Sequence, residues 1–313
     1  MKKSIVAALV PLLLLCGCSS ATENSSTRFM LDTVISVRAA ASAEVINGAF
    51  SVCSEYEKLL SKTAQGSDVY NINQLGVFEV SSQTAQLISN AKFYYELTNG
   101  RFDISVGAVS GLWDFENGVK PDDAAVTAAL KNVGYNNICI TGNTVDSGGT
   151  SIDLGAIAKG YIADKMREYF EAQGVKEAVL NLGGNVVLMG REKSVSVQDP
   201  FGQGEKATIL LKDTSVATAG TYERCFTENG VNYHHILDTK TGYPAQSDVV
   251  SATVITKSAE KADALSTCIV LMGCKSGIDI INGLQGVEAL VITADGSVHV
   301  SDGLYCENGV YRL

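Results

Sequence analysis

The chain has 313 residues, with 34 acidic against 24 basic side chains and a formal net charge of -10. It contains no basic stripe or basic helix, which excludes a protein that binds nucleic acid through its phosphates. The length suffices for a sizeable core. An acidic protein that handles an anionic substrate needs a metal ion, a lysine or a helix N-terminus to offset the charge.

The first residues predict export of the protein. Two lysines precede the apolar run Ile5–Leu15, which is too short to span a bilayer and is typical of a signal peptide. The motif L-C-G-C that follows resembles a bacterial lipoprotein box with lipid on Cys18; the alternative is an ordinary cleaved signal with an incidental cysteine. We expect residues 1–17 to be a signal peptide of the lipoprotein type, residues 18–27 a serine-rich, lipid-anchored tether and residues 28–313 one functional domain.

Residue patterns predict both helices and strands in the first half of the chain. Alternating β-branched residues predict a strand over Phe29–Ala40. Apolar residues at helical spacing predict helices over 43–62, 84–98, 122–132 and 156–173, and short strands are expected around Ile138, Val145 and Ser151.

The second half is richer in strands. They are expected over 178–190, 194–200, 207–213 and 215–220, around the histidine pair at 234–235, and over 249–257, 289–295 and 297–303, with helices over 259–272 and 276–282. Strands and helices neither alternate regularly nor separate cleanly. This pattern favours a single α+β domain of mixed, largely antiparallel strands with packed helices over a doubly wound sheet.

Six cysteines follow Cys18, at wide spacing and without a C-x-x-C pair. The spacing argues against a zinc site. Cys139 and Cys268 lie in apolar runs and are predicted to be buried thiols. Disulfides occur in exported proteins, but a chain of this length does not need them, so the pairing stays open.

Two of the three histidines, His234 and His235, are adjacent in the run YHHILDTKTGYP. On or beside a strand, successive side chains point to opposite faces, so only one of the pair can face a pocket. The third, His299, lies in the predicted strand SVHVSD and is expected to be structural.

Asp263 and Thr267 are four residues apart on a predicted helix and therefore share one face. A carboxylate and a hydroxyl are oxygen donors that suit a hard cation such as Mg²⁺. The alternative is an acidic residue near a helix N-terminus beside a threonine whose hydroxyl is satisfied by the backbone.

The run SIDLGAIAKGYIAD places Asp153 at the end of a strand and Lys159 in the first turn of a helix. Small residues at such a turn allow a phosphate to approach the backbone and a lysine to pair with it. Tight helix–strand packing with an exposed lysine is the alternative. Asp103 is predicted to lie within an apolar strand, where burial requires either a backbone partner or a ligand.

These motifs, in this order, resemble the flavin transferase family, also called ApbE or FAD:protein FMN transferase. The matching pieces are FMLDTVISV, RFDISVGAVSGLW, SIDLGAIAKGYIAD, LNLGGN, VQDP, ATAGTYER, YHHILDTKTGYP and ADALSTCIVLMG, and they extend from Phe29 to Gly273. The resemblance implies an enzyme that cleaves the diphosphate of FAD with Mg²⁺, transfers FMN to a threonine or serine hydroxyl of an acceptor protein and releases AMP. It makes residues 28–313 the flavin transferase domain.

The resemblance also implies roles for individual residues. The metal ligands would be Asp263, Thr267 and the Ala156 carbonyl, and the catalytic base would be His235, with His234 as its supporting neighbour. The FAD-contacting positions would be Leu31, Arg101, Phe102, Asp103, Asp153, Lys159 and Ile236.

The implied acceptor is a subunit of an extracytoplasmic redox complex, and the implied location is the extracytoplasmic face of the cell membrane, through the lipid anchor. Two other functions stay open: a Mg²⁺-dependent FAD pyrophosphatase that gives FMN and AMP, and a flavin-binding lipoprotein without turnover. The pyrophosphatase differs from a transferase only in which hydroxyl reaches the phosphorus, whereas a binding protein needs no general base.

Overall fold

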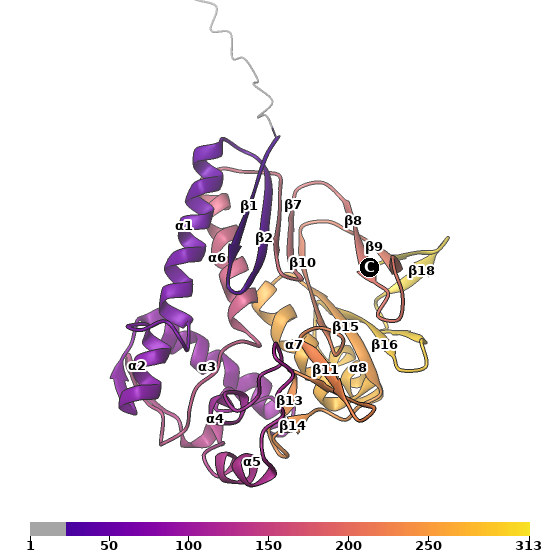
Figure 1. Ribbon diagram of the computed structural model, residues 1–313. Helices are drawn as coiled ribbons and strands as arrows, with labels where there is room; N and C mark the ends of the chain where they lie inside the picture. The colour runs from indigo at the N-terminus through magenta and orange to yellow at the C-terminus, as the bar shows by residue number, and fades with distance from the viewer. Residues whose placement is uncertain (1–22) are drawn as a thin grey trace, which may run out of the picture.

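The computed structural model describes residues 23–313 (Figure 1); the predicted signal peptide, Cys18 and residues 18–22 of the predicted tether lie outside the described residues. The helices are α1 Ala43–Leu60, α2 Asp68–Leu75, α3 Ser82–Leu97, α4 Gly107–Ser110, α5 Asp123–Leu130, α6 Ala158–Ala172, α7 Ala259–Met272 and α8 Cys274–Asn282. The strands are β1 Glu23–Met30, β2 Thr33–Ala40, β3 Val77–Glu79, β4 Cys139–Thr141, β5 Thr144–Asp146, β6 Ala178–Leu182, β7 Asn185–Met189, β8 Lys193–Gln198, β9 Glu205–Leu211, β10 Thr214–Gly220, β11 Cys225–Glu228, β12 Val231–His234, β13 Leu237–Asp238, β14 Tyr243–Pro244, β15 Val249–Thr256, β16 Val287–Thr293, β17 Val298–Val300, β18 Tyr305–Glu307 and β19 Val310–Arg312.

An eight-stranded sheet forms the middle layer, with strand order β1-β2-β6-β7-β10-β15-β16-β17 and antiparallel pairing throughout. Side chains along its strands alternate between two cores. On β16, Ala289 and Val291 enter a core shared with α1, α6 and α7, while Leu290 and Ile292 enter a smaller core shared with the four-stranded sheet β18-β19-β9-β8. The helices therefore cover one face and the small sheet covers the other (Figure 1).

This arrangement confirms the predicted single α+β domain with mostly antiparallel strands. Several strand predictions are wrong. The strand expected over 178–190 is divided between β6 and β7, which form a hairpin around Gly183 and Gly184. Phe29–Ala40 is divided between β1 and β2, which form a hairpin around Leu31 and Asp32, both with a φ of 54°. Two left-handed residues are what a two-residue hairpin turn requires. Ser151 forms only an isolated bridge to Val106.

Further expectations concern the N-terminal strand and the cysteines. Strand β1 begins at Glu23, so residues 23–27 of the predicted tether lie within the sheet. All six described cysteines are free thiols. Cys268 is buried, as predicted, but Cys139 is exposed, because it lies on the short edge strand β4 with its side chain turned outward. None of the described helices is both long and apolar enough to cross a membrane.

One carboxylate fixes the N-terminus of α7 to α6. Asp164 accepts hydrogen bonds from the Ser258 hydroxyl at 2.9 Å and from the first two N–H groups of α7 at 2.9 and 3.1 Å. Negative charge at a helix N-terminus is favourable. These bonds set the position of the helix that carries the predicted acid–hydroxyl pair.

Helices α6 and α7 also approach each other closely at Gly160. A Cβ atom at this position would lie 2.2 Å from the Ala259 carbonyl oxygen and 2.7 Å from the Cβ of Asp263. Both neighbours belong to the backbone or to the stem of a side chain, so neither can move aside. The close approach therefore requires glycine here.

We expect Gly160→Ala to lower the free energy of unfolding by about 2–3 kcal/mol, at the upper end of what overpacking usually costs. The matched control is Gly48→Ala on α1, where the added Cβ meets only the ring end of Tyr169, a half-buried side chain that can turn away. Urea unfolding followed by circular dichroism measures both variants. Equal, small losses would contradict the packing argument.

Candidate active site

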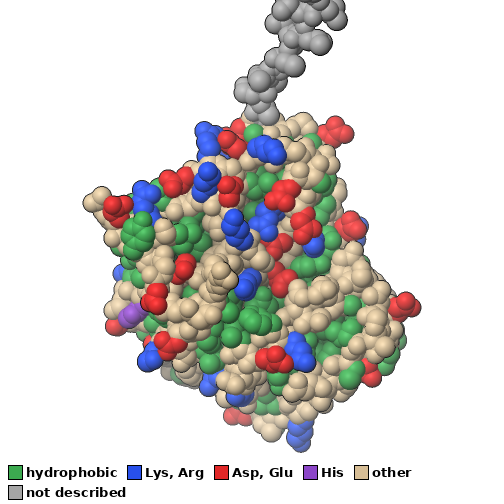
Figure 2. Space-filling model, turned by 180° about the vertical axis from the view of Figure 1, so that it is seen from behind, with side chains coloured by type: hydrophobic (Ala, Val, Ile, Leu, Met, Phe, Trp, Pro, Cys, Tyr) green, Lys and Arg blue, Asp and Glu red, His purple; other side chains and the backbone are tan. Residues whose placement is uncertain are grey.

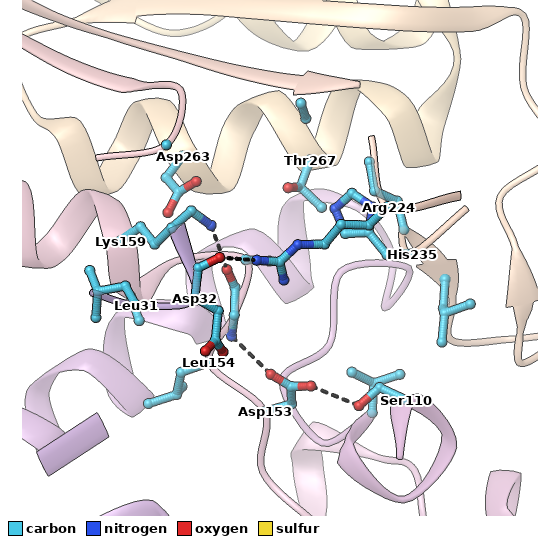
Figure 3. A pocket seen from close by; sticks show the side chains of 18 of the residues that line it. Leu31, Asp32, Ser110, Asp153, Leu154, Lys159, Arg224, His235, Asp263 and Thr267 are labelled. Atoms are coloured by element: carbon cyan, nitrogen blue, oxygen red, sulfur yellow. Dashed lines mark hydrogen bonds between the residues drawn. The ribbon is translucent and has the colours of Figure 1, made fainter. Parts of the chain in front are cut away.

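A cleft of about 950 Å³ lies where α7, the start of α6, the β1–β2 turn and the segments after β10 and β12 meet (Figure 3). Its volume is at the upper end of the range for small-molecule sites. Every described residue of the predicted site lines it: Leu31, Arg101, Phe102, Asp103, Asp153, Ala156, Lys159, His235, Ile236, Asp263 and Thr267. The fold brings these residues together, and their individual roles stay predictions.

The two adjacent histidines have different environments. His234 is buried at the end of β12; its Nε2–H donates to the Ala245 carbonyl at 3.2 Å, and its Nδ1 accepts from the Ile236 N–H at 3.3 Å. His235 lines the cleft (Figure 3), and its Nδ1–H donates to the Glu223 carbonyl at 3.1 Å. Since a carbonyl can only accept, this bond leaves Nε2 of His235 as the unprotonated nitrogen.

Burial keeps both imidazoles neutral at pH 7. It lowers the pKa of His234 below its ordinary value and lowers the pKa of His235 to about 4, although the carbonyl that each ring faces opposes the shift. A neutral His235 with a free Nε2 can accept a proton, whereas both nitrogens of His234 are occupied. Of the two histidines, His235 is therefore the one with a nitrogen available to a substrate, and its role as the base stays a prediction.

Asp263 and Thr267 lie one turn apart on α7, above the cleft in Figure 3. The Asp263 carboxylate is buried and accepts hydrogen bonds from the Gly160 N–H at 2.9 Å and from the Asn185 amide at 3.1 Å. In a regular helix Gly160 would instead donate to the Ala156 carbonyl, and no described N–H donates to that carbonyl. A carboxylate, a hydroxyl and a free carbonyl thus line one cleft.

A charged network that no motif predicted forms another part of the wall. Lys62 lies 2.6 Å from one carboxylate oxygen of Asp153, and the Ser110 hydroxyl donates to the same oxygen at 2.7 Å. The second oxygen accepts from the Gly155 N–H at 2.9 Å. Burial alone raises the pKa of Asp153, but the charge of Lys62 and these hydrogen bonds outweigh it and hold the pKa below its ordinary value.

We expect Lys62→Met to lower the free energy of unfolding at pH 7 by about 1 kcal/mol, because Asp153 loses its cation while water screens this partly exposed pair. The loss should shrink as the pH falls below 3.8, the ordinary pKa of an aspartate side chain. Below that pH Asp153 becomes protonated first in the unfolded chain and then, at its lowered pKa, in the native state, so the ion pair contributes less to stability. Denaturation at pH 7 and pH 3 measures this.

The control for that pair is Lys275→Met. Lys275 pairs with Asp279 at 2.8 Å, but both side chains are exposed, so we expect no measurable change. A loss in Lys62→Met that does not depend on pH would contradict the charge argument.

Four basic side chains line the cleft among the described residues: Lys62, Arg101, Lys159 and Arg224. Arg101 is paired with Asp238 at 2.6 Å. Lys159 and Arg224 form no ion pair with any described residue, and donate only to the carbonyls of Gly155 and Asp32, at 3.3 and 3.2 Å. They are the charges available to an anionic substrate. On the face of the molecule seen in Figure 2, acidic and basic side chains are interspersed.

Asp103 lies in a turn rather than in the predicted strand. One oxygen accepts from the N–H and the hydroxyl of Ser105, at 2.8 and 2.6 Å, and the other accepts from the Tyr135 N–H at 2.9 Å. Burial raises the pKa of Asp103, although these bonds oppose the shift. The burial of Asp103 required either a backbone partner or a ligand, and the structure shows two backbone N–H groups and one hydroxyl as partners. Its contact with FAD stays a prediction.

A neutral histidine, an acid–hydroxyl pair and two cations without an ion-pair partner among the described residues surround one cleft, a combination typical of enzymes that act on phosphorylated substrates. Residues 31–291 match the ApbE family. A curated FAD:protein FMN transferase from Treponema pallidum (strain Nichols) is 31% identical over 332 residues, covering 93% of this chain and 92% of the relative.

Solved structures agree with the sequence match. The ApbE protein from Thermotoga maritima MSB8 has a TM-score of 0.82 at 32% identity, over 90% of this chain and 97% of that chain. The flavin transferase ApbE from Vibrio cholerae has a TM-score of 0.79 at 26% identity, over 90% and 98%. The chain therefore belongs to the ApbE family. It is an enzyme of the flavin transferase class, as the sequence predicted.

Proposed function

We propose that this enzyme transfers FMN from FAD to a threonine or serine hydroxyl of an acceptor protein, with Mg²⁺, and releases AMP. The observation that carries the proposal is the presence of His235, with its free Nε2, in the same cleft as Asp263, Thr267 and the free Ala156 carbonyl. The names of the relatives support flavin as the transferred group.

The donor set fits a hard cation. A carboxylate, a hydroxyl and a backbone carbonyl are oxygen ligands, and three of them leave room for water and phosphate oxygens around Mg²⁺. No cluster of three or more His, Cys, Asp or Glu side chains in the described part of the chain could hold a metal by itself, so Thr267 and Ala156 are needed beside Asp263. When bound, the ion neutralises charge on the diphosphate.

The protein's own residues divide the remaining work. Nε2 of His235 accepts the proton of the acceptor hydroxyl as the hydroxyl oxygen bonds to the FMN phosphorus. The bond from that phosphorus to the bridging oxygen breaks, and its electron pair leaves with AMP. Lys159 and Arg224 offset the phosphate charge. Positioning and charge neutralisation of this kind account for most of the acceleration in phosphoryl transfer.

We also propose that Cys18 carries lipid and holds the domain on the extracytoplasmic face of the membrane, because L-C-G-C follows an apolar run after two lysines. The acceptor would then be an extracytoplasmic subunit of a membrane-bound redox complex. Mass spectrometry of the N-terminal peptide of the mature protein tests the lipid; an unmodified Cys18 would reject this part.

The transferase itself is tested with protein that lacks residues 1–18, incubated with FAD, Mg²⁺ and a candidate acceptor domain. Intact-mass spectrometry should show FMN added to the acceptor, with AMP as the second product. FMN and AMP formed without an adduct on any acceptor offered would indicate a pyrophosphatase. Absence of FAD turnover with metal present would reject both enzymes.

A further inference from the structure

Asn185 has a buried carbonyl oxygen without a partner. The residue is 3% exposed and lines the cleft, and its Oδ1 has no hydrogen-bond partner among the described residues. Buried polar atoms are nearly always paired, so an exception needs an explanation. The predicted metal site is adjacent, because Nδ2 of Asn185 lies 3.1 Å from Oδ1 of Asp263.

Hydrogen bonding decides which end of the amide faces Asp263. A carboxylate has no hydrogen to donate, so only the NH2 end of Asn185 can contact it. Turning the amide over would place two acceptor oxygens side by side. The backbone is also held, because Asn185 pairs with Leu182 on β6 and with Ala217 on β10. The free Oδ1 is therefore held beside Asp263.

The turn before Asn185 explains how a polar side chain reaches this position. Gly183 and Gly184 have φ of 61° and 94°, which disfavour other residues. A Cβ on Gly183 would lie 2.4 Å from Oγ1 of Thr33, so the turn packs tightly against β2. The run LNLGGN thus forms a tight hairpin that starts β7 at the cleft.

We propose that Asn185 is a positioning residue of the cation site: its NH2 group orients Asp263, and its Oδ1 accepts a hydrogen bond from a water bound to the cation. The inference rests on the Mg²⁺ site of the proposed function. Mg²⁺ usually keeps several waters in protein sites. A neutral amide accepts from such a water without placing a second negative charge beside Asp263.

The experiment measures the cation alone, without FAD or turnover. Mn²⁺ is titrated into the purified protein, and the free ion is followed by electron paramagnetic resonance. We expect Asn185→Ala to weaken Mn²⁺ binding about 10- to 100-fold, the usual effect of losing a group that supports a metal site. Asn185→Asp loses the NH2 group but retains an oxygen acceptor and adds a negative charge, so it should bind Mn²⁺ more tightly than Asn185→Ala does.

Asn185→Asp separates the two roles. If the amide only oriented Asp263, this variant would weaken Mn²⁺ binding as much as Asn185→Ala does, and the role of Oδ1 would be overturned. The matched control is Ser251→Ala, which removes a buried hydroxyl on β15 that does not line the cleft. Its Mn²⁺ affinity should equal that of the wild type.

Asp263→Asn separates this inference from the function on which it rests. Equal Mn²⁺ binding by the wild type and Asp263→Asn would overturn the metal site and the inference together. Binding that depends on Asp263 but is unchanged in Asn185→Ala would overturn only the role of Asn185. Circular dichroism and the rise in Tm on adding Mn²⁺ establish that each variant is folded and report binding independently.

Discussion

Asp263→Asn should reduce FMN transfer about 10³-fold or more and leave the fold intact. Asparagine keeps the size of the side chain, but it removes the one carboxylate among the three proposed ligands. Groups that neutralise charge in phosphoryl transfer contribute about 10³–10⁵ in rate. The rate is followed by mass spectrometry of the acceptor at saturating FAD, with the Mg²⁺ concentration raised stepwise.

The matched control is Glu260→Gln, one turn earlier on α7. The carboxylate of Glu260 accepts from Asn90 and Tyr94 at 2.8 and 3.4 Å and does not line the cleft. Its rate should stay close to that of the wild type. Transfer at the wild-type rate by Asp263→Asn would reject the assigned ligand.

His235→Ala should lower the rate about 10²–10⁴-fold, the range for loss of a general acid–base group. In the wild type, kcat/KM should fall only as the pH drops through about 4, not near 6.5, because burial holds the pKa of His235 at about 4 in the free enzyme. The kcat profile should fall at a higher pH, since a bound diphosphate raises the pKa of a neighbouring histidine.

The control for this series is His299→Gln. His299 is exposed on β17, outside the cleft, and both profiles should match those of the wild type. If kcat/KM of His235→Ala fell in acid as it does in the wild type, protonation of a group other than His235 would cause that fall. A near-normal rate in the same variant would show that the acceptor hydroxyl does not need this base.

Residues on regular elements were the predictable part of the site. A spacing of four residues puts Asp263 and Thr267 on one face of any helix, and α7 is the helix that the apolar pattern predicted. His234 ends β12 and His235 follows it, and the expectation that only one of two adjacent side chains beside a strand faces a pocket agrees with their different environments. The strand pattern alone does not say which of them faces the cleft; their hydrogen bonds in the folded protein do.

The remaining residues depend on contacts between distant segments. Lys62 acquires its role from Asp153, which is 91 positions away, and Asn185 from Asp263, 78 positions away. No local pattern encodes such pairs. The β1–β2 turn was missed for a different reason: Leu31-Asp32 lacks the glycine or asparagine that usually marks a two-residue turn, and the alternation of apolar residues continues through it.

The β1–β2 hairpin also determines how the domain responds to a mechanical load. Glu23 pairs with Ala40 at one end of the hairpin, and the turn at the other end lines the cleft. Eight residues of antiparallel strand span about 27 Å. Among the described strands β1 is an edge strand that pairs with β2 alone, so we expect tension on its N-terminal end to open the hairpin one residue pair after another. The wall of the cleft is the last part to yield.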